Sequence, residues 1–177
     1  NTNEPHAEIR VAIRELCKKF DSHYWQELDK KNEYPVEFVK ILTNSGWLSS
    51  LIPEEYGGSG LTLNQSSVIL EEINRSGGNS GACHAQMYIM GTLLRHGNLY
   101  QKKNFLPKIA SGELRLQSFA VTEPSTGSDT TRLKTFAFKK GDKYIINGQK
   151  IWTSRIQHTD LVLLLARTKP ISSIKYK

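Results

Sequence analysis

The spacing of the apolar residues changes near residue 116, and this change constrains the fold more than any other feature of the sequence. Before it, apolar residues recur three or four positions apart, which places them on one face of a helix. In residues 7–20 this stripe consists of Ile9, Ile13, Leu16 and Phe20. After it, short runs rich in Ile, Phe, Tyr and Thr are separated by turn residues, as is typical of β-strands. The sequence therefore predicts an α+β chain, with an all-α helical domain at 1–116 and a β domain at 117–177.

Local signals place the helices and loops of the first domain. Pro35 stands where a helix can begin. Thr62 is a predicted N-cap, and Gln65, three residues later, is its capping-box partner. Further apolar stripes predict helices at 79–95 and 99–110. The segment YGGSG at 56–60 lacks the G-x-G-x-x-G spacing and the preceding strand of a dinucleotide site, which favours a flexible loop.

The β domain is expected to hold strands in four short runs, at 133–140, 143–147, 149–154 and 161–167. Asn147-Gly148, between two of these runs, predicts a hairpin turn. So few strands cannot close a barrel, and their open edges would invite pairing with other chains. We therefore expect residues 117–177 to be part of a β domain, and the chain to be a fragment of a longer protein.

The composition is that of a soluble globular protein, with 38% hydrophobic and 23% charged residues. The longest apolar run, LVLLLA at 161–166, is too short to cross a bilayer, and the N-terminus has no signal-peptide pattern. Cys17 and Cys83 lie far apart and the five histidines do not cluster, so we expect neither a disulfide framework nor a metal site. These features predict an intracellular protein that is not secreted and has no membrane partner.

The positive charge is concentrated in the last third of the chain. The net charge is +7, but residues 1–116 carry equal numbers of basic and acidic residues, so the whole excess lies in 117–177. Such an excess suits an anionic ligand, for example a nucleotide or a phosphorylated cofactor. A solvated basic surface is the commoner cause of the same pattern.

One face of the predicted helix at 79–95 carries an unusual set of side chains. At helical spacing, this face consists of Gly81, His84, Ala85 and Tyr88. The commoner explanation is a packed contact with another helix, in which the histidine is hydrogen-bonded. The alternative is that the small residues leave room for a ligand beside the histidine.

Two segments of the β region carry polar groups suited to ligand binding. FAVTEPSTGSD at 119–129 gathers hydroxyls, two carboxylates and a glycine in one turn. In KIWTSR, strand alternation would direct Trp152 and Ser154 to the same side. An indole beside a hydroxyl can stack on a planar ring and hydrogen-bond to its edge. A tryptophan on a half-buried strand is more often plain core, so this pattern alone does not establish a site.

Taken together, these segments resemble the acyl-CoA dehydrogenase family, a group of FAD flavoproteins. The matching segments are IPEEYGGSG (52–60), HGNLYQKKNFLPKIASGE (96–113), FAVTEPSTGSD (119–129) and YIINGQKIWTS (144–154). They occur in the family's order and at its spacing, and the resemblance covers nearly the whole chain. It implies an N-terminal helical domain, a middle antiparallel β-barrel domain and a C-terminal helical bundle. This chain would supply the first domain and the first strands of the second, with the C-terminal bundle absent from it.

The resemblance also implies which residues bind ligands. The FAD site would consist of Phe119, Val121, Thr122, Gly127, Ser128, Trp152 and Ser154. Thr122 would contact the pyrimidine side of the flavin, Trp152 would pack against its ring, and Ser154 would hydrogen-bond near its reactive nitrogen. Gly127 would permit close backbone approach, and Ser128 would lie where FAD borders the CoA chain. The acyl part of the substrate would meet the helix face formed by Gly81, His84, Ala85 and Tyr88.

The chain departs from the family's pattern near the end of this segment. Many members have threonine where Ser154 stands; serine keeps the hydroxyl and loses the methyl group. Many members also continue with Asn-Gly where this chain has Arg155. Strand alternation would direct Arg155 away from the flavin, so we expect no loss of FAD binding from it.

The implied reaction is FAD-dependent α,β-desaturation of an acyl-CoA thioester by a homotetramer or homodimer, with an electron-transferring flavoprotein as electron acceptor. The catalytic base would be a glutamate beyond Lys177, so residues 1–177 alone would be inactive. Glu123 would instead fix its loop or contact backbone N–H groups. The setting would be the bacterial cytoplasm or the mitochondrial matrix, and no nucleic-acid partner is expected. Three alternatives stay open: an acyl-CoA oxidase, a flavoprotein of this fold with another role such as nucleic-acid binding, and a non-catalytic member that acts through assembly.

Overall fold

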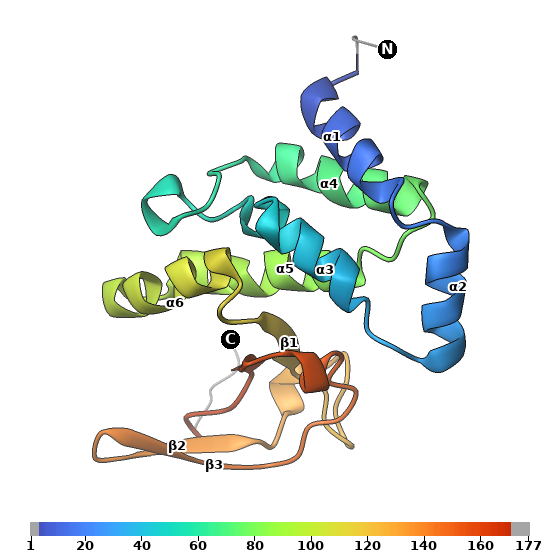
Figure 1. Ribbon diagram of the computed structural model, residues 1–177. Helices are drawn as coiled ribbons and strands as arrows, with labels where there is room; N and C mark the ends of the chain where they lie inside the picture. The colour runs from blue at the N-terminus through green and yellow to red at the C-terminus, as the bar shows by residue number, and fades with distance from the viewer. Residues whose placement is uncertain (1–3, 171–177) are drawn as a thin grey trace. The chain divides into compact units, whose positions relative to one another are not determined.

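The computed structural model describes residues 4–170, in which six α-helices are followed by four short strands (Figure 1). The chain divides into two compact units, Asn1–Leu116 and Gln117–Lys177. The first contains all the α-helices of the described residues, and the second contains the strand pairs apart from the first residue of β1. The predicted α+β order, helices first and strands second, is confirmed.

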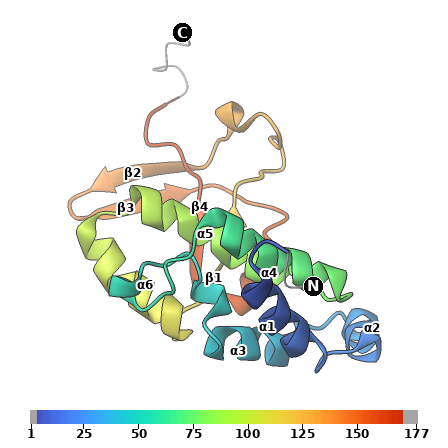
Figure 2. The same ribbon diagram turned by 90° about the horizontal axis from the view of Figure 1, so that it is seen from above.

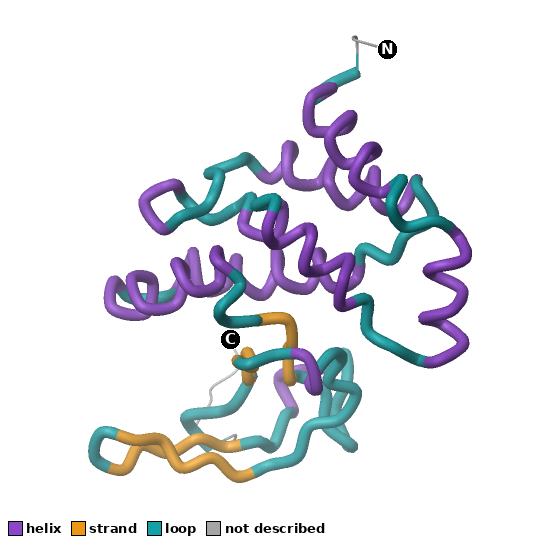
Figure 3. The backbone as a smooth tube through the Cα atoms, viewed as in Figure 1, coloured by secondary structure: helices purple, strands orange, loops and turns teal. Residues whose placement is uncertain are grey.

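The helical unit is built from elements of ordinary length joined by short loops (Figure 3). The α-helices are α1 (Ala7–Cys17), α2 (Ser22–Lys31), α3 (Val36–Asn44), α4 (Leu63–Arg75), α5 (Gly81–His96) and α6 (Leu99–Ser111). The short 3₁₀ turns η1 (Trp47–Ser49) and η2 (Glu54–Tyr56) lie between α3 and α4. Thr62 caps α4 in a complete capping box with Gln65, as predicted, and an equivalent box formed by Asn98 and Gln101 starts α6.

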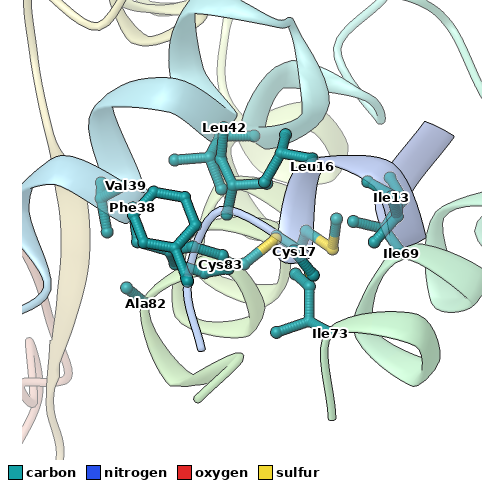
Figure 4. Packing of buried hydrophobic residues seen from close by; sticks show 13 residues of the cluster. Ile13, Leu16, Cys17, Phe38, Val39, Leu42, Ile69, Ile73, Ala82 and Cys83 are labelled. Carbon is teal, nitrogen blue, oxygen red and sulfur yellow. The ribbon is translucent and has the colours of Figure 1, made fainter. Parts of the chain in front are cut away.

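The core of this unit lies where α1, α3, α4 and α5 meet. Helices α1 and α4 pack against each other (Figure 1 and Figure 2). Figure 4 shows side chains of this cluster, which includes Ile13, Leu16, Phe38, Val39, Leu42, Ile69, Ile73, Ala82 and Cys83. The stripe predicted for 7–20 supplies its α1 side, with Ile9 at the edge. Burial of this stripe, rather than helix propensity alone, stabilises the short helix.

Helix α2 was not anticipated from the sequence. The Asp21 carboxylate caps it by accepting the Tyr24 N–H at 2.9 Å, but no side chain of α2 is buried. Its aromatic residues reach the core only at the rim, where Trp25 packs edge-on against Phe38 with ring centroids 4.9 Å apart. A helix held by a few aromatic contacts leaves a weak periodic signal, because most of its positions face solvent.

The second unit contains two separate strand pairs. Strand β1 (Leu116–Ala120) pairs with β4 (Leu161–Leu164), and β2 (Phe136–Lys140) pairs antiparallel with β3 (Lys143–Asn147). Between β2 and β3, the turn is Gly141-Asp142, and Gly141 adopts the left-handed conformation, with φ of 63°. The register places Phe136 opposite Asn147 and Lys140 opposite Lys143.

The prediction of a strand at 149–154 and of a hairpin at Asn147-Gly148 was wrong. Residues 149–154 are irregular, and Trp152 has a φ of 58°, which no strand residue adopts. A glycine is needed at 148 because the backbone there passes close to Thr135, and not because it forms a hairpin turn. A Cβ at that position would lie 2.3 Å from Thr135 Oγ1 and 2.7 Å from its Cα. The requirement for glycine at 148 therefore comes from Thr135, a neighbour distant in sequence.

Candidate functional site

Two segments of the second unit, residues 118–123 and 150–154, are hydrogen-bonded to each other, and we call them the cradle segments. The joining bonds are Ile151 N–H to the Thr122 carbonyl (2.9 Å), Ser118 Oγ to the Ser154 carbonyl (2.8 Å) and Lys150 Nζ to the Val121 carbonyl (2.8 Å). The two motifs singled out in the sequence are therefore adjacent in space. Between them they hold five of the seven residues expected at a flavin.

The cradle segments present aromatic and hydroxyl groups to the outside of the described chain. Trp152 is 84% exposed and Phe119 is 37% exposed. Ser154 is also exposed, whereas Val121 and Thr122 are half-buried. No strand forms at Trp152, so the alternation that was expected to direct Trp152 and Ser154 to the same side does not apply, although both side chains are exposed. Large exposed aromatic side chains are typical of surfaces that another molecule covers.

The turn at 123–127 separates buried from exposed positions of the FAVTEPSTGSD segment. Glu123 and Thr126 exchange backbone hydrogen bonds of 2.9 and 3.1 Å around Pro124-Ser125. Glu123 and Thr126 are both buried, whereas Gly127 is exposed, and a Cβ added there would meet no atom within 4 Å. The fold of this chain therefore does not itself require a glycine at 127. Ser128, which follows, is also exposed.

Glu123 is a structural carboxylate in this unit. Its side chain is 3% exposed and accepts hydrogen bonds from the Lys134 N–H (2.6 Å), the Thr135 N–H (2.8 Å) and Lys150 Nζ (2.9 Å). Burial by itself raises the pKa of Glu123, but the hydrogen bonds from Thr135, Lys134 and Lys150 outweigh it and lower the pKa to about 2. The expectation that Glu123 contacts backbone N–H groups is confirmed. Such an acidic and fully engaged group is a poor proton acceptor near neutral pH.

The lowered pKa of Glu123 gives a stability that depends on pH. In an unfolded chain the pKa of Glu123 would be near its ordinary value of 4.5. The ionised carboxylate therefore contributes its full stabilisation above pH 4.5, and this contribution is lost as the pH falls toward 2. A shift of this size corresponds to about 3 kcal/mol. We expect Glu123→Gln to lower the unfolding free energy by about that amount at pH 7, with the gap narrowing between pH 4.5 and 2. Urea denaturation of both proteins across this range measures the gap; a gap that stays constant would contradict the assignment.

Lys150 was not among the residues picked out from the sequence. Its side chain is only 9% exposed, and its ammonium group contacts both the Val121 carbonyl and the Glu123 carboxylate. The signal in the sequence was its place inside YIINGQKIWTS, whose aromatic and hydroxyl groups predicted the site. A buried lysine is rare unless its charge is paired, and here Glu123 is the paired group.

In the helical unit, α5 carries the other predicted ligand face. His84 is exposed and Tyr88 is 42% exposed, with their ring centroids 5.0 Å apart. Gly81 is half-buried and Ala85 is fully buried, so the four positions do not form one accessible surface. The interpretation of His84 as part of a packed helix contact was wrong for the described chain. Helical spacing identifies a face, but the neighbouring elements decide how much of it is covered.

The chemistry of the cradle segments suits an aromatic ligand with a polar edge. The accessible indole and phenyl groups can pack on a flat ring, and the hydroxyls of Thr122, Ser128 and Ser154 can hydrogen-bond to its rim or to phosphate. The open position at Gly127 leaves space for close approach. Among residues 4–170, no group of three or more His, Cys, Asp or Glu side chains is placed to hold a metal ion. In the same range, no helix is long and apolar enough to cross a bilayer.

Comparison with known families assigns both units. The model for the acyl-CoA dehydrogenase N-terminal domain matches residues 3–113, and that for the acyl-CoA dehydrogenase middle domain matches residues 118–176. The chain belongs to the acyl-CoA dehydrogenase family. Its N-terminal domain is thus the helical unit, and its middle-domain segment contains the cradle segments. The resemblance seen in the sequence is confirmed.

Relatives of known activity and structure share this membership. The chain is 36% identical to the mitochondrial isovaleryl-CoA dehydrogenase of Bos taurus, covering 94% of this chain and 40% of that protein. It is 35% identical to cyclohex-1-ene-1-carbonyl-CoA dehydrogenase of Syntrophus aciditrophicus, covering 93% and 39%. The crystal structure of an acyl-CoA dehydrogenase from Geobacillus kaustophilus matches with a TM-score of 0.85 at 32% identity, covering 95% of this chain and 44% of that one. The chain spans less than half the length of these family members.

Proposed function

We propose that this chain forms the flavin-binding part of an acyl-CoA dehydrogenase, which removes hydrogen from Cα and Cβ of an acyl-CoA thioester. The observation that carries the proposal is the adjacency of the cradle segments, which sets the exposed Trp152 next to the Thr122 backbone through the Ile151 hydrogen bond. Family membership supports this chemical class of reaction. The relatives named for isovaleryl-CoA and cyclohex-1-ene-1-carbonyl-CoA support acyl-CoA as the substrate class and leave the acyl group open.

Five residues of the cradle segments have a proposed role toward FAD, which supplies the hydride-accepting ring when it is bound. Trp152 and Phe119 offer apolar surface to that ring, and the Thr122 and Ser154 hydroxyls hydrogen-bond to its polar edge. Val121 lines the same surface from the half-buried side. Preorganised hydrogen-bond donors of this kind orient a cofactor and tune its electronics without taking part in the organic chemistry.

Substrate contacts are proposed for each unit separately. In the second unit, we assign Gly127 and Ser128 to the border between FAD and the CoA chain. His84 and Tyr88 are the accessible polar groups of α5 and are assigned to the acyl part, with Gly81 beside them. The fully buried Ala85 of α5 is left out of this assignment.

Proton abstraction from Cα is proposed to use a base other than Glu123, since that carboxylate is already engaged by three donors. To make the Cα proton acidic enough for removal, the thioester oxygen must accept hydrogen bonds that strengthen as enolate charge develops. We propose an electron-transferring flavoprotein as the electron acceptor and a homo-oligomer as the assembly, as the family resemblance implies.

The direct test uses the full-length protein that contains this chain. We expect the purified protein to carry FAD, with its visible absorption band bleached under anaerobic conditions by at least one acyl-CoA of a panel that varies in length and branching. A protein that takes up no FAD, or a flavin that no acyl-CoA reduces, would contradict the proposed function. Oxygen consumption without an added electron acceptor would assign the protein to the oxidases instead.

The Gly127→Ala variant tests whether the glycine is needed for stability of the fold or for ligand binding. Because a Cβ at this position meets nothing within 4 Å, we expect the unfolding free energy to change by less than about 0.5 kcal/mol. If FAD and CoA approach the backbone here, the added methyl group should weaken their binding at least tenfold. Binding titrations of FAD and of an acyl-CoA provide the measurement.

The matched control for this variant is Ser125→Ala. Ser125 is an exposed turn residue two positions earlier, and it is given no ligand contact. We expect Ser125→Ala to leave both affinities within about twofold, which is the scale of a surface substitution. Equal binding by the Gly127→Ala and Ser125→Ala proteins would remove Gly127 from the proposed site.

A further inference from the structure

We propose that Lys150 and Glu123 form a clasp that positions the Trp152–Ser154 stretch for the flavin, so that both are positioning residues in addition to their part in stability. The inference rests on the proposed function, because it assigns these residues a task toward FAD. It concerns two charged groups that do not themselves contact the ligand. Their contribution acts through the segment that carries the exposed indole.

The clasp is a buried ion pair with additional hydrogen bonds. Lys150 Nζ lies 2.9 Å from Glu123 Oε1 and 2.8 Å from the Val121 carbonyl oxygen, and the side chains are 9% and 3% exposed. One ammonium group thus contacts two positions of the first cradle segment from the beginning of the second. Charge-assisted bonds of this kind fix geometry more strongly than neutral ones.

The Glu123 side of the clasp is also bonded to the two residues that precede strand β2. Glu123 also accepts the N–H groups of Lys134 and Thr135, at 2.6 and 2.8 Å. Gly148, two residues before Lys150, lies so close to Thr135 that a Cβ would overlap with it. The chain that leads into the second cradle segment is therefore held by the same elements that hold Glu123.

Trp152 needs such anchoring because its own side chain supplies none. The indole is 84% exposed, so little burial fixes it. Its backbone has a φ of 58°, a left-handed conformation that disfavours residues with a Cβ. The bonds on either side hold this conformation: Lys150 and Ile151 precede it, and the Ser154 carbonyl accepts from Ser118 after it. Strained residues held by their surroundings are concentrated at functional sites.

A purely structural ion pair would predict a different pattern of mutant effects. Removing only one partner leaves a buried charge without its counter-ion, whereas removing both eliminates that charge. If the pair serves only stability, FAD binding should follow stability in every variant. If it positions the Trp152–Ser154 stretch, FAD binding should stay weak even when stability is regained.

The experiment compares Lys150→Met, Glu123→Gln and the double variant in the full-length protein. Each is measured for resistance to urea, for the dissociation constant of FAD after removal and re-addition of the cofactor, and for the shape of the visible flavin band. We expect Lys150→Met to weaken FAD binding at least tenfold and to alter the band. The double variant should regain part of the lost stability but keep the weak binding and the altered band.

A charge removal in the helical unit provides the stability-matched control. Arg14→Met breaks an ion pair with Glu72 that is unrelated to the cradle segments, and we expect it to lower stability while leaving FAD affinity within twofold. Parent-like FAD affinity and band shape in Lys150→Met would overturn the clasp proposal. So would recovery of affinity in step with stability in the double variant. If the parent protein binds no FAD, the proposed function fails, which is a separate outcome.

Discussion

Replacing Glu72 with alanine is expected to lower the unfolding free energy of the helical unit by about 3 to 5 kcal/mol, the range found when one partner of a buried ion pair is removed. Glu72 is fully buried on α4, yet it carries a charge. Arg10 and Arg14 of α1 donate to it at 2.6, 2.7 and 2.9 Å. Urea denaturation followed by the helical circular dichroism signal measures the loss.

The expected loss of stability is large because of the hydrogen bonds that the Glu72 carboxylate accepts. Two guanidinium groups occupy both of its oxygens, which is the condition under which a charge can be buried at all. Without Glu72, both arginines lose a charged acceptor at the α1–α4 contact, and a cavity remains beneath them. Arg14 has a second carboxylate partner, Glu4 at 2.9 Å, but that pair is partly exposed and therefore weak compensation.

Glu71 is the matched control, since it is the neighbouring glutamate and also pairs with Arg10, at 2.9 Å. Its side chain is 56% exposed, and exposed ion pairs contribute about 0 to 1 kcal/mol. We therefore expect Glu71→Ala to be nearly neutral. If the Glu71→Ala and Glu72→Ala proteins unfold within 1 kcal/mol of each other, roughly the uncertainty of such measurements, the burial argument is wrong.

The stability from Glu72 should depend on pH with a definite sign. The hydrogen bond from Arg14 lowers the pKa of Glu72, and although burial opposes it, the bond from Arg10 adds to the lowering below the ordinary value of 4.5. A carboxyl with a lowered folded pKa stabilises the protein above its unfolded pKa and loses that contribution as the pH falls. The difference between the parent and Glu72→Ala should therefore be largest above pH 4.5 and shrink in acid.

Local patterns in the sequence predicted the helical unit well, because the interactions that define a helix face lie within four residues. The α1 stripe and the Thr62–Gln65 capping box were found at the predicted positions. The missing element, α2, presents too few apolar positions for such a pattern. Helical spacing also did not predict which part of the α5 face is covered, where Ala85 is buried and His84 is exposed.

In the cradle segments, local sequence patterns did not predict the backbone conformation. The two motifs are hydrogen-bonded to each other in the structure, but the alternation assigned to 149–154 assumed a strand that does not form. Glycine can mark either a turn or a close approach, and Gly148 is the second case, because its neighbour is Thr135. The Lys150–Glu123 pair joins positions 27 residues apart. No periodic pattern in the sequence indicates such a pair, so the sequence did not predict it.

Gly58→Ala is expected to be the other severe substitution, with a loss of more than about 4 kcal/mol, the level reached only by the most disruptive single changes. A Cβ on this residue would lie 2.0 Å from the Ile52 carbonyl oxygen and 2.4 Å from the Ile52 Cβ. Ile52 is fully buried, so it has little freedom to move away. Thermal and urea unfolding of the variant, or its failure to accumulate as folded protein, provide the measurement.

The loop at 56–60 cannot relieve the clash by moving, because its backbone is bonded to the chain before it. Gly60 N–H donates to the Ile52 carbonyl at 2.9 Å, and Leu61 N–H donates to the Ser50 carbonyl at 2.7 Å. The segment is a loop, as predicted, but these bonds make it a closely packed part of the helical unit instead of a flexible one.

Gly91 offers the opposite case within the same unit. It lies inside α5, and a Cβ there would meet no atom within 4 Å. Alanine at a helical position without a clash should stabilise by up to about 1 kcal/mol, because it restricts the unfolded chain and favours the helix. If Gly58→Ala lowers the unfolding free energy and Gly91→Ala raises it, the requirement for glycine at 58 comes from the close approach to Ile52, and not from glycine content as such. A mild effect of Gly58→Ala would mean that the loop can reopen, and the tight packing of YGGSG against Ile52 would then not be a constraint on this fold.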